Sequence, residues 1–463
     1  MDLTTDVGAP RLPEAGLTAA LDRARRLGRP VLLSLARPLA DAGDLLPLVA
    51  AARAAGAQAA LLERAGHVVA ALGAAWARDA AGAGRFAALR DAAAALFADA
   101  LVDGDAAPLA VAAFAFADAP PVGAWRGFPA ARAVIPRAAI VRRGDTATLS
   151  LNLVVEPRAD AEVLAGRLRR TLARLRGWQA TPPDAAGSPR YAATPVPEPA
   201  EWQRRVRRVL DDLAAGAIDK LVLARTCRLE ADAPFACAAA VERLRRAHPA
   251  CTTFWFGGRA GDFLGATPEV LLARNGPAVA TAALAGSCGR GDSVAADTAL
   301  TNALLASAKD RREHAIVVDA IAAALRPFCA ALDVAPTPEV LRLPTVQHLR
   351  TPIAGRLGGD CHILDLVAAL HPTPAVGGHP RAAALARLAA HEGLERGWYA
   401  GPLGWFDAAG DGRFDVALRA ALVRERQALL YAGAGIVAGS DPAAELAETR
   451  LKLQPLLAAL MEL

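Results

Sequence analysis

The stretch Lys220-Leu221-Val222-Leu223-Ala224-Arg225-Thr226 is an apolar β-strand pattern that begins with a lysine. Just before it, Trp202, Val206 and Val209 recur at helical spacing, and Gly216 is placed to cap the C-terminus of that helix. A helix that leads directly into a strand predicts mixed α and β structure. The lysine at the entrance of the strand is the first candidate functional residue.

Lysine is rare in this chain. Lys220, Lys309 and Lys452 are the only three lysines among 52 lysine and arginine residues. The guanidinium of arginine keeps its proton in proteins, whereas an ammonium is a compact point charge that can deprotonate when buried. We therefore expect that some of these positions require an amine. The alternative is that they are ordinary surface lysines.

Composition excludes several classes of protein. The chain has 463 residues, 54% of them hydrophobic, so it can bury a large core. A net charge of +5 and an aromatic content of 5% do not indicate a basic groove with stacking platforms, so no nucleic-acid partner is expected.

The N-terminal sequence and the cysteines indicate a cellular compartment. The start, Met1-Asp2-Leu3-Thr4-Thr5-Asp6, lacks a signal-peptide pattern, and no apolar stretch reaches the roughly 20 residues that span a bilayer. The six cysteines all lie in the second half, without the short spacings of a zinc site or a disulfide framework. We expect a cytoplasmic protein without a membrane partner.

The first half alternates predicted helices and strands and contains little concentrated chemistry. Helices are expected at 46–59 and 85–98, and strands at 68–72, 109–116 and 146–153. A stretch rich in Pro, Ala, Gly, Ser and Thr, 179–201, is typical of a connection. It divides the chain into an N-terminal part, 1–185, and a catalytic region, 186–463.

The last third also alternates strands and helices. Strands are expected at 270–274, 415–423 and 428–432, and helices at 297–325 and 364–370. Asp441-Pro442 is typical of a helix N-cap followed by proline at the first helical position. On this last helix Glu445, Glu448 and Lys452 share one face.

Two helices each carry acidic residues. Lys309 and Glu313 lie one turn apart, which by itself indicates only a salt bridge on a solvated face. Glu445 and Glu448 form a second acidic group on another helix. Carboxylates from two helices are one way to hold Mg²⁺, which takes few protein ligands and completes its shell with water and substrate. Spacing alone leaves both interpretations open.

Three further segments are candidates for substrate contacts. The glycines of 433–439 lie after a predicted strand and before a helix, but their spacing does not match a dinucleotide-binding fingerprint. Such glycines still allow a close approach of the backbone to a ligand. Glu269 follows Pro268 at a strand entrance and is either a general acid or an ordinary strand-end residue. Leu284-Ala285-Gly286-Ser287 is expected to be a small-residue turn that presents backbone N–H groups.

Taken together, these segments resemble the chorismate-utilising enzymes, the family of isochorismate, salicylate, anthranilate and aminodeoxychorismate synthases. The matching stretches run in family order from Lys220 to Lys452. They are 220–225, 265–269, 285–287, 307–314, 345–349, 370–378, 398–402, 416–419, 433–439 and 445–452.

The resemblance implies a role for each candidate residue. Lys220 matches the general base that activates water for attack at C2 of chorismate, and Glu269 matches the general acid at the C4 hydroxyl. The implied Mg²⁺ ligands are Glu313 and Glu448, with Glu445 beside them. The implied substrate-binding residues are Gly286, Ser287, His348, Tyr399, Arg419, Gly435 and Lys452. A dianionic substrate requires such cations and a metal ion to neutralise and orient it.

Residue types narrow the reaction. In this resemblance the amine-transferring members have glutamine where this chain has Lys220, and the aminodeoxychorismate enzymes have lysine where it has Ala285. Water is therefore the expected nucleophile, and no glutamine amidotransferase subunit is implied. Leu446 departs from the family, in which an aromatic residue often follows the first glutamate.

The resemblance therefore predicts an α+β fold of two subdomains, each of sheets flanked by helices, with the active site between them. It predicts a Mg²⁺-dependent isochorismate synthase, an isomerase, in which 1–185 is a variable part of the same fold. The first half is more similar to menaquinone-type enzymes, although siderophore biosynthesis and any oligomeric state stay open. The alternatives are a salicylate synthase, which also eliminates pyruvate, and a non-catalytic chorismate-binding protein.

Overall fold

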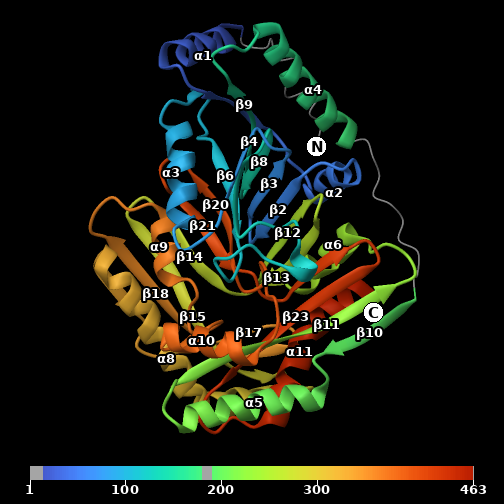
Figure 1. Cartoon of the computed structure of the whole chain (residues 1–463), viewed down its shortest axis with the longest axis vertical. Coiled ribbons are helices and arrows are strands. Elements are labelled where there is room, and N and C mark those ends of the chain that lie inside the picture. The colour runs from blue at the N-terminus through green and yellow to red at the C-terminus, as the bar shows by residue number, and fades with distance from the viewer. Residues whose placement is uncertain (1–13, 180–189, 462–463) are drawn as a thin grey trace.

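The computed structural model describes residues 14–179 and 190–461. Within these residues the strands form two large sheets, one of 13 strands and one of 10 (Figure 1). Side by side, the strands of the larger sheet are β10 (Tyr191–Val196), β11 (Lys220–Ala231), β23 (Gln427–Ile436), β22 (Ala420–Arg424), β13 (Gly261–Thr267), β12 (Thr252–Gly258), β2 (Ala59–Arg64), β3 (His67–Leu72), β8 (Ala138–Arg143), β9 (Thr146–Val155), β1 (Val31–Leu39) and β5 (Leu101–Asp103), with β19 (Gly378–His379) beside β11. Those of the smaller sheet are β16 (Cys329–Val334), β18 (Val346–Leu357), β15 (Ala278–Gly289), β14 (Val270–Asn275), β21 (Gly412–Val416), β20 (Pro402–Asp407), β6 (Leu109–Phe114), β7 (Ala131–Ile135) and β4 (Trp76–Ala80), with β17 (Glu339–Arg342) beside β18.

Helices pack against both sheets. They are α1 (Glu14–Leu27), α2 (Leu46–Ala54), α3 (Arg85–Phe97), α4 (Ala161–Gln179), α5 (Pro199–Ala214), α6 (Cys237–Ala247), α7 (Val294–Ala306), α8 (Ala308–Leu325), α9 (Ile363–Leu370), α10 (Arg381–His391) and α11 (Pro442–Met461). Helix α11 contacts β23, α5 and α6, while α8 contacts β15, β16 and β18 of the other sheet. In Figure 1 α5 and α11 lie together at the lower end of the molecule, far from α1 and α4.

The core follows from the alternation of side chains along strands. On β2, Leu61 belongs to a core cluster that includes Leu48 of α2, whereas its neighbour Leu62 belongs to a second cluster that includes Phe114 and Phe414 of the smaller sheet. Both faces of this strand are therefore buried, one against helices and one against the other sheet. This arrangement explains why β2 is apolar at successive positions rather than alternating with polar residues.

Both halves of the chain contribute to both sheets. Leu61 of β2 pairs with Trp255 of β12, and Ala113 of β6 pairs with Leu403 of β20. The predicted α+β fold with sheets flanked by helices is confirmed. The predicted boundary after residue 185 lies outside the described residues and stays a prediction.

Local signals at two helix ends are confirmed. Helix α5 is followed by Gly216 at φ +68°, a left-handed conformation that suits glycine. At the start of α11, Asp441 Oδ1 accepts hydrogen bonds from the backbone N–H groups of Ala443 and Ala444 at 3.0 and 2.8 Å. Such a cap satisfies N–H groups that have no partner within the helix.

Three predicted segments differ from the structure: two helices and one connection. The predicted helix at 297–325 is two helices, because Ser307 adopts ψ 114° and caps α8, its Oγ accepting from the Asp310 N–H. Part of the expected connection at 179–201 is strand β10, which pairs with β11, while 180–189 lie outside the described residues. The predicted helix at 46–59 ends at Ala54, and Ala59 already belongs to β2.

Three predicted strands or turns are also wrong in detail. The strand expected at 415–423 is broken into β21 and β22 by Arg419, which has φ +48°. The strand expected at 428–432 continues to Ile436 as β23, so Gly433 and Gly435 lie within it, whereas Gly439 follows it. The expected turn at 284–287 lies within β15, where Gly286 has φ +75° and the pairing register shifts between Ala285 and Ser287.

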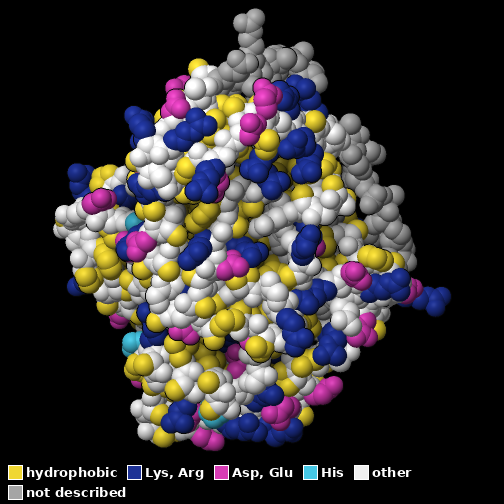
Figure 2. All heavy atoms as spheres, turned by 45° about the horizontal axis from the view of Figure 1, so that its top comes forward, with side chains coloured by type: hydrophobic (Ala, Val, Ile, Leu, Met, Phe, Trp, Pro, Cys, Tyr) yellow, Lys and Arg dark blue, Asp and Glu magenta, His cyan; other side chains and the backbone are white. Residues whose placement is uncertain are grey.

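The surface carries mixed charge. On the face drawn in Figure 2, basic side chains are interspersed with acidic and hydrophobic ones. Among the helices of residues 14–179 and 190–461, none combines the length and apolar character needed to cross a bilayer.

Candidate active site

A small cavity between the two sheets gathers most of the predicted site residues. Ten of the twelve line it: Glu269, Gly286, Ser287, Glu313, His348, Tyr399, Arg419, Gly435, Glu448 and Lys452. The space is only about 80 Å³. Because ligand pockets usually measure about 300–1,000 Å³, the side chains must separate when a substrate enters. Of the two remaining residues, Lys220 contacts this set through its ion pair with Glu313, whereas Glu445 pairs with Lys309, which does not line the cavity.

Lys220 lies at the first position of β11 and is completely buried. Its Nζ lies 2.9 Å from Glu313 Oε1 of α8. The angles are not those of a hydrogen bond, so among the described residues the ammonium donors remain unused. Burial raises the pKa of Glu313, but Lys220, with help from Lys452 and Lys309, holds that pKa below its usual value.

Gly435 makes room for this ion pair. It lies on β23 opposite Val222 of β11. A Cβ at this position would lie 2.2 Å from Glu313 Oε1 and 3.2 Å from Lys220 Cε. Glycine is therefore required here by the approach of the carboxylate and not by backbone conformation.

Glu269 is the buried carboxyl group at the end of β13. Its backbone is fixed, because the Val416 N–H donates to the Glu269 carbonyl and the Glu269 N–H donates to Thr267 Oγ1. Burial raises the pKa of Glu269 to about 7, against the opposing charges of Lys220 and Lys452. Near neutral pH this carboxyl group therefore exists in both protonated and ionised forms, as a general acid requires.

Each lysine of the chain is paired with one of the three predicted metal-ligating glutamates. Besides the Lys220–Glu313 pair, Lys452 Nζ lies 2.6 Å from Glu448 Oε1, and Lys309 Nζ lies 2.7 Å from Glu445 Oε1. Lys309 thus pairs across to α11 rather than with Glu313 one turn along its own helix, as the spacing had suggested. All three lysines of the chain therefore lie at or beside this site, and the requirement for an amine at these positions stays a prediction.

The carboxylates fit a hard divalent cation with few protein ligands. Glu313 and Glu448 both face the cavity. Burial, followed by the charge of Glu448, raises the pKa of Glu445, although Lys309 opposes this rise. Within the described residues no three acidic, histidine or cysteine side chains form a complete metal site. This donor set suits Mg²⁺, whose shell is completed by water and substrate oxygens.

Arg419, His348 and Ser287 form a chain of hydrogen bonds along one wall. Arg419 Nη2 lies 2.9 Å from His348 Nε2, and His348 Nδ1 lies 2.8 Å from Ser287 Oγ. Burial, followed by the charge of Arg419, lowers the pKa of His348 well below its usual value. Because arginine can only donate, Nε2 of the neutral ring must accept and Nδ1 must carry the proton.

This tautomer leaves donors for a ligand. His348 Nδ1–H donates to Ser287 Oγ, so the Ser287 hydroxyl proton is free to point elsewhere. Arg419 Nη1 is buried and has no hydrogen-bond partner among the described residues. A buried, unpaired guanidinium N–H that lines a cavity is suited to a carboxylate. The left-handed turn at Arg419 that interrupts the predicted strand brings this side chain to the wall.

Two pocket residues were not predicted from the sequence. Arg396 is buried in an ion pair with Glu392, and its Nη1 and Nη2 donate to the carbonyls of Val376 and Val222 at 2.8 and 2.7 Å. Tyr431 stacks on Tyr399 with ring centroids 4.8 Å apart. The four-residue spacing of Glu392 and Arg396 signals an ion pair, but only the fold places that pair on the pocket wall.

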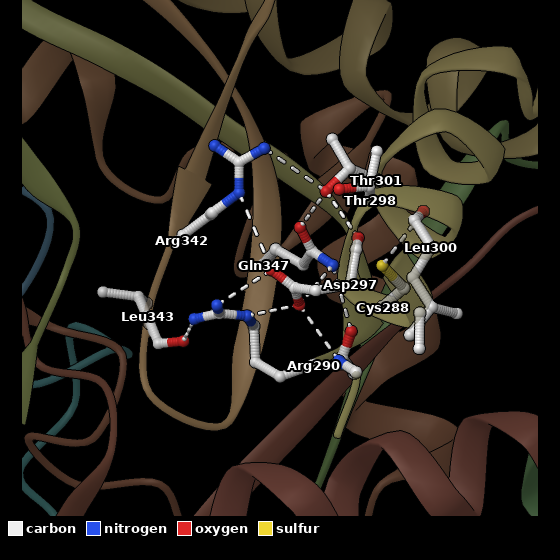
Figure 3. Close-up of polar contacts among 12 residues, drawn as sticks. Cys288, Arg290, Asp297, Thr298, Leu300, Thr301, Arg342, Leu343 and Gln347 are labelled. Atoms are coloured by element: carbon white, nitrogen blue, oxygen red, sulfur yellow. Dashed lines mark hydrogen bonds and ion pairs between the residues drawn. The ribbon is translucent and has the colours of Figure 1, made fainter. Parts of the chain in front are cut away.

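A polar network outside the cavity fixes the strand ends that carry Ser287 and His348 (Figure 3). Arg290 Nε and Nη2 donate to Asp297 Oδ1 and Oδ2 at 2.6 and 2.9 Å, which ties the end of β15 to α7. Thr301 Oγ1 donates to Gln347 Oε1 at 2.7 Å, and Gln347 Nε2 donates to the Gly289 carbonyl at 3.2 Å. Gln347 therefore joins α7, β15 and β18 directly beside His348.

The fold, with a buried cavity of polar and charged side chains between its two sheets, matches a known class of enzyme. The family model described as chorismate binding enzyme matches residues 19–461. The chain belongs to this family.

Named relatives agree with the family. A salicylate biosynthesis isochorismate synthase from Pseudomonas aeruginosa is 40% identical over 368 residues, which are 79% of this chain and 77% of that protein. The structure of MenF, the menaquinone-specific isochorismate synthase from Escherichia coli, matches with a TM-score of 0.77 and 29% identity, covering 96% of this chain and all of that one. Anthranilate synthase component I from Streptococcus pneumoniae has the same fold, with a TM-score of 0.67 at 21% identity over 85% of this chain and 92% of that one.

Proposed function

We propose that the protein is an isochorismate synthase that converts chorismate to isochorismate by addition of water at C2 and loss of the C4 hydroxyl. One observation carries this proposal: a carboxyl group with a pKa of about 7 and an unpaired guanidinium N–H line one buried cavity, and a buried amine lies 2.9 Å from a carboxylate of its wall. The names of the relatives support the same activity.

The chain's residues would divide the chemistry as follows. Lys220, as the neutral amine, takes a proton from water as the oxygen bonds to C2. The ring double bonds shift, and the protonated Glu269 gives its proton to the C4 hydroxyl, which leaves as water. One water is consumed and one is released, so the net reaction is an isomerisation. Each proton transfer by a positioned side chain typically contributes about 10²–10⁴-fold.

The remaining residues would hold the substrate. Arg419 Nη1 and the Ser287 hydroxyl supply donors for a carboxylate, and Lys452 adds positive charge. Bound Mg²⁺, held by Glu313 and Glu448 with Glu445 beside them, would neutralise and orient substrate carboxylate charge. When the cation binds, the lysines would exchange their glutamate partners for other contacts, which would also release Lys220 from Glu313.

Replacing Glu448 with glutamine is expected to raise the Mg²⁺ concentration for half-maximal activity by at least about tenfold, as loss of a group supporting a metal site typically does. Direct Mg²⁺ binding, followed by titration calorimetry without substrate, should weaken in parallel. Glu162→Gln, at an exposed residue of α4, is the matched control. An unchanged Mg²⁺ titration in Glu448→Gln would remove this residue from the ligand set.

The product of the reaction tests the proposed function. Purified protein incubated with chorismate and Mg²⁺, with the products separated by chromatography, is expected to yield isochorismate without salicylate. Salicylate and pyruvate as main products would instead identify a salicylate synthase. Binding of chorismate without any product would identify a non-catalytic binding protein.

A further inference from the structure

A second and larger cavity lies away from the candidate active site. It holds about 970 Å³, at the upper end of the usual range for ligand pockets, about 300–1,000 Å³. Its walls come from β2, β3, β12 and β13 of the larger sheet and from β6 and β7 of the smaller one. It shares no lining residue with the candidate active site. We refer to it as the intersheet groove.

The floor of the groove is apolar, and small residues create its volume. Ala60, Ala71 and Ala112 are almost completely buried, at 4%, 3% and 1% exposure, and line the cavity where larger side chains would fill it. Phe128 and Trp398 form an aromatic corner, with ring centroids 5.0 Å apart. Such a floor suits a ring or a short hydrocarbon chain.

The rim of the groove carries unbalanced positive charge. Two of its five arginines are neutralised, because Arg53 Nε lies 2.9 Å from Asp262 and Arg132 Nε lies 2.6 Å from Asp79. The other three arginines form no ion pair with any described residue. They are Arg126, Arg259 and Arg424. Glu425 is the single further acid among the described residues that line the groove.

Arg424 has unused hydrogen-bonding capacity. Its Nη2 donates to the Arg126 backbone carbonyl at 2.5 Å, and both residues line the groove. Its Nε is buried and has no partner among the described residues. Arginines without acidic partners beside an apolar cavity are suited to a carboxylate or phosphate that is attached to an apolar body.

We propose that the intersheet groove is a second ligand site, which binds an amphipathic organic anion with its ring or chain on the alanine and aromatic floor and its anionic group on the arginines of the rim. The site is independent of the proposed reaction, since none of its residues lines the active-site cavity.

Binding of 1-naphthoate, measured by titration calorimetry on the full chain, tests this site. The wild-type protein is expected to bind it, and 1-naphthylmethanol, which has the same ring without the charge, is expected to bind at least about tenfold more weakly, since hydrogen bonds to charged groups supply this discrimination. Arg259→Ala should weaken naphthoate binding by a similar factor. Arg174→Ala, at an exposed arginine of α4, is the matched control and should change nothing.

A filling substitution tests the position of the ligand without removing charge. A Cβ at Gly258, which lines the groove, meets no atom within 4 Å, so the backbone there accepts a side chain, and the ring of Gly258→Trp is expected to occupy the groove. It is expected to abolish naphthoate binding, while Arg419→Ala in the active site is expected to leave it unchanged. The proposal is overturned if wild-type protein does not bind naphthoate, if the neutral alcohol binds equally well, or if Arg419→Ala removes binding and Gly258→Trp does not.

Discussion

Lys220→Arg is expected to lower kcat by about 10²–10⁴-fold while chorismate still binds, because a guanidinium keeps the positive charge but cannot accept a proton from water. Lys220 is completely buried beside Glu313. The arginine variant still places a positive charge beside this glutamate, but it has no neutral amine that could accept a proton. Isochorismate formation gives kcat, and calorimetry with chorismate gives binding. Lys220→Met removes the amine with less bulk and should be equally inactive.

Lys309→Arg provides the matched control for Lys220. Both lysines form ion pairs with buried glutamates, Lys309 at 2.7 Å from Glu445 and Lys220 at 2.9 Å from Glu313. Lys309 does not line the cavity, and nothing in its contacts requires an amine rather than a guanidinium. We expect Lys309→Arg to retain activity within a few fold of the wild type. A Lys220→Arg variant with comparable activity would disprove the general-base assignment.

Glu269→Gln is expected to cause a loss of similar size, about 10²–10⁴-fold in kcat, since the amide cannot donate a proton to the departing hydroxyl. Burial raises the pKa of Glu269 to about 7, so the carboxyl group is protonated below that pH and loses its proton above it. Because the acid must be protonated to act, wild-type kcat should fall as pH rises through about 7. A profile of kcat against pH, measured at saturating chorismate, records this fall as the alkaline limb.

The pH profile separates a catalytic role from a structural one. If Glu269 only supports the fold, Glu269→Gln would lower the melting temperature or raise KM but leave the alkaline limb of kcat in place. If Glu269 is the general acid, the residual activity of the variant should lose that limb. The wild-type enzyme measured over the same pH range with saturating chorismate is the reference.

Local patterns predicted the elements whose signals lie within one segment. The N-cap at Asp441 and the apolar strand from Lys220 depend on neighbouring residues only, and both are present. The interruption at Arg419 was missed because Asp415 to Val423 is suitable for a strand throughout, and arginine carries no local signal for a left-handed conformation. The break at Ser307 was missed because the serine is also compatible with a helix interior.

In the candidate site, too, local signals were predicted and contacts between distant segments were not. Helical spacing suggested that Lys309 pairs with Glu313, but its Nζ lies 2.7 Å from Glu445 Oε1 of α11. Spacing within one helix cannot indicate which carboxylate a second helix supplies. The resemblance to the family named twelve residues, ten of which line one cavity, whereas the rarity of lysine only suggested that some positions require an amine. Arg396 was not recognised, because its contacts are to backbone carbonyls that only the fold places near it.

Conversion of chorismate in water enriched in oxygen-18 tests the central claim most directly, with the product analysed by chromatography and mass spectrometry. Addition of water at C2 predicts isochorismate that is heavier by one oxygen-18 substitution, with the label in the C2 hydroxyl. Unlabelled isochorismate would contradict the mechanism, because the C4 hydroxyl would then have moved without exchange with water. Labelled salicylate as the main product would contradict the assigned reaction.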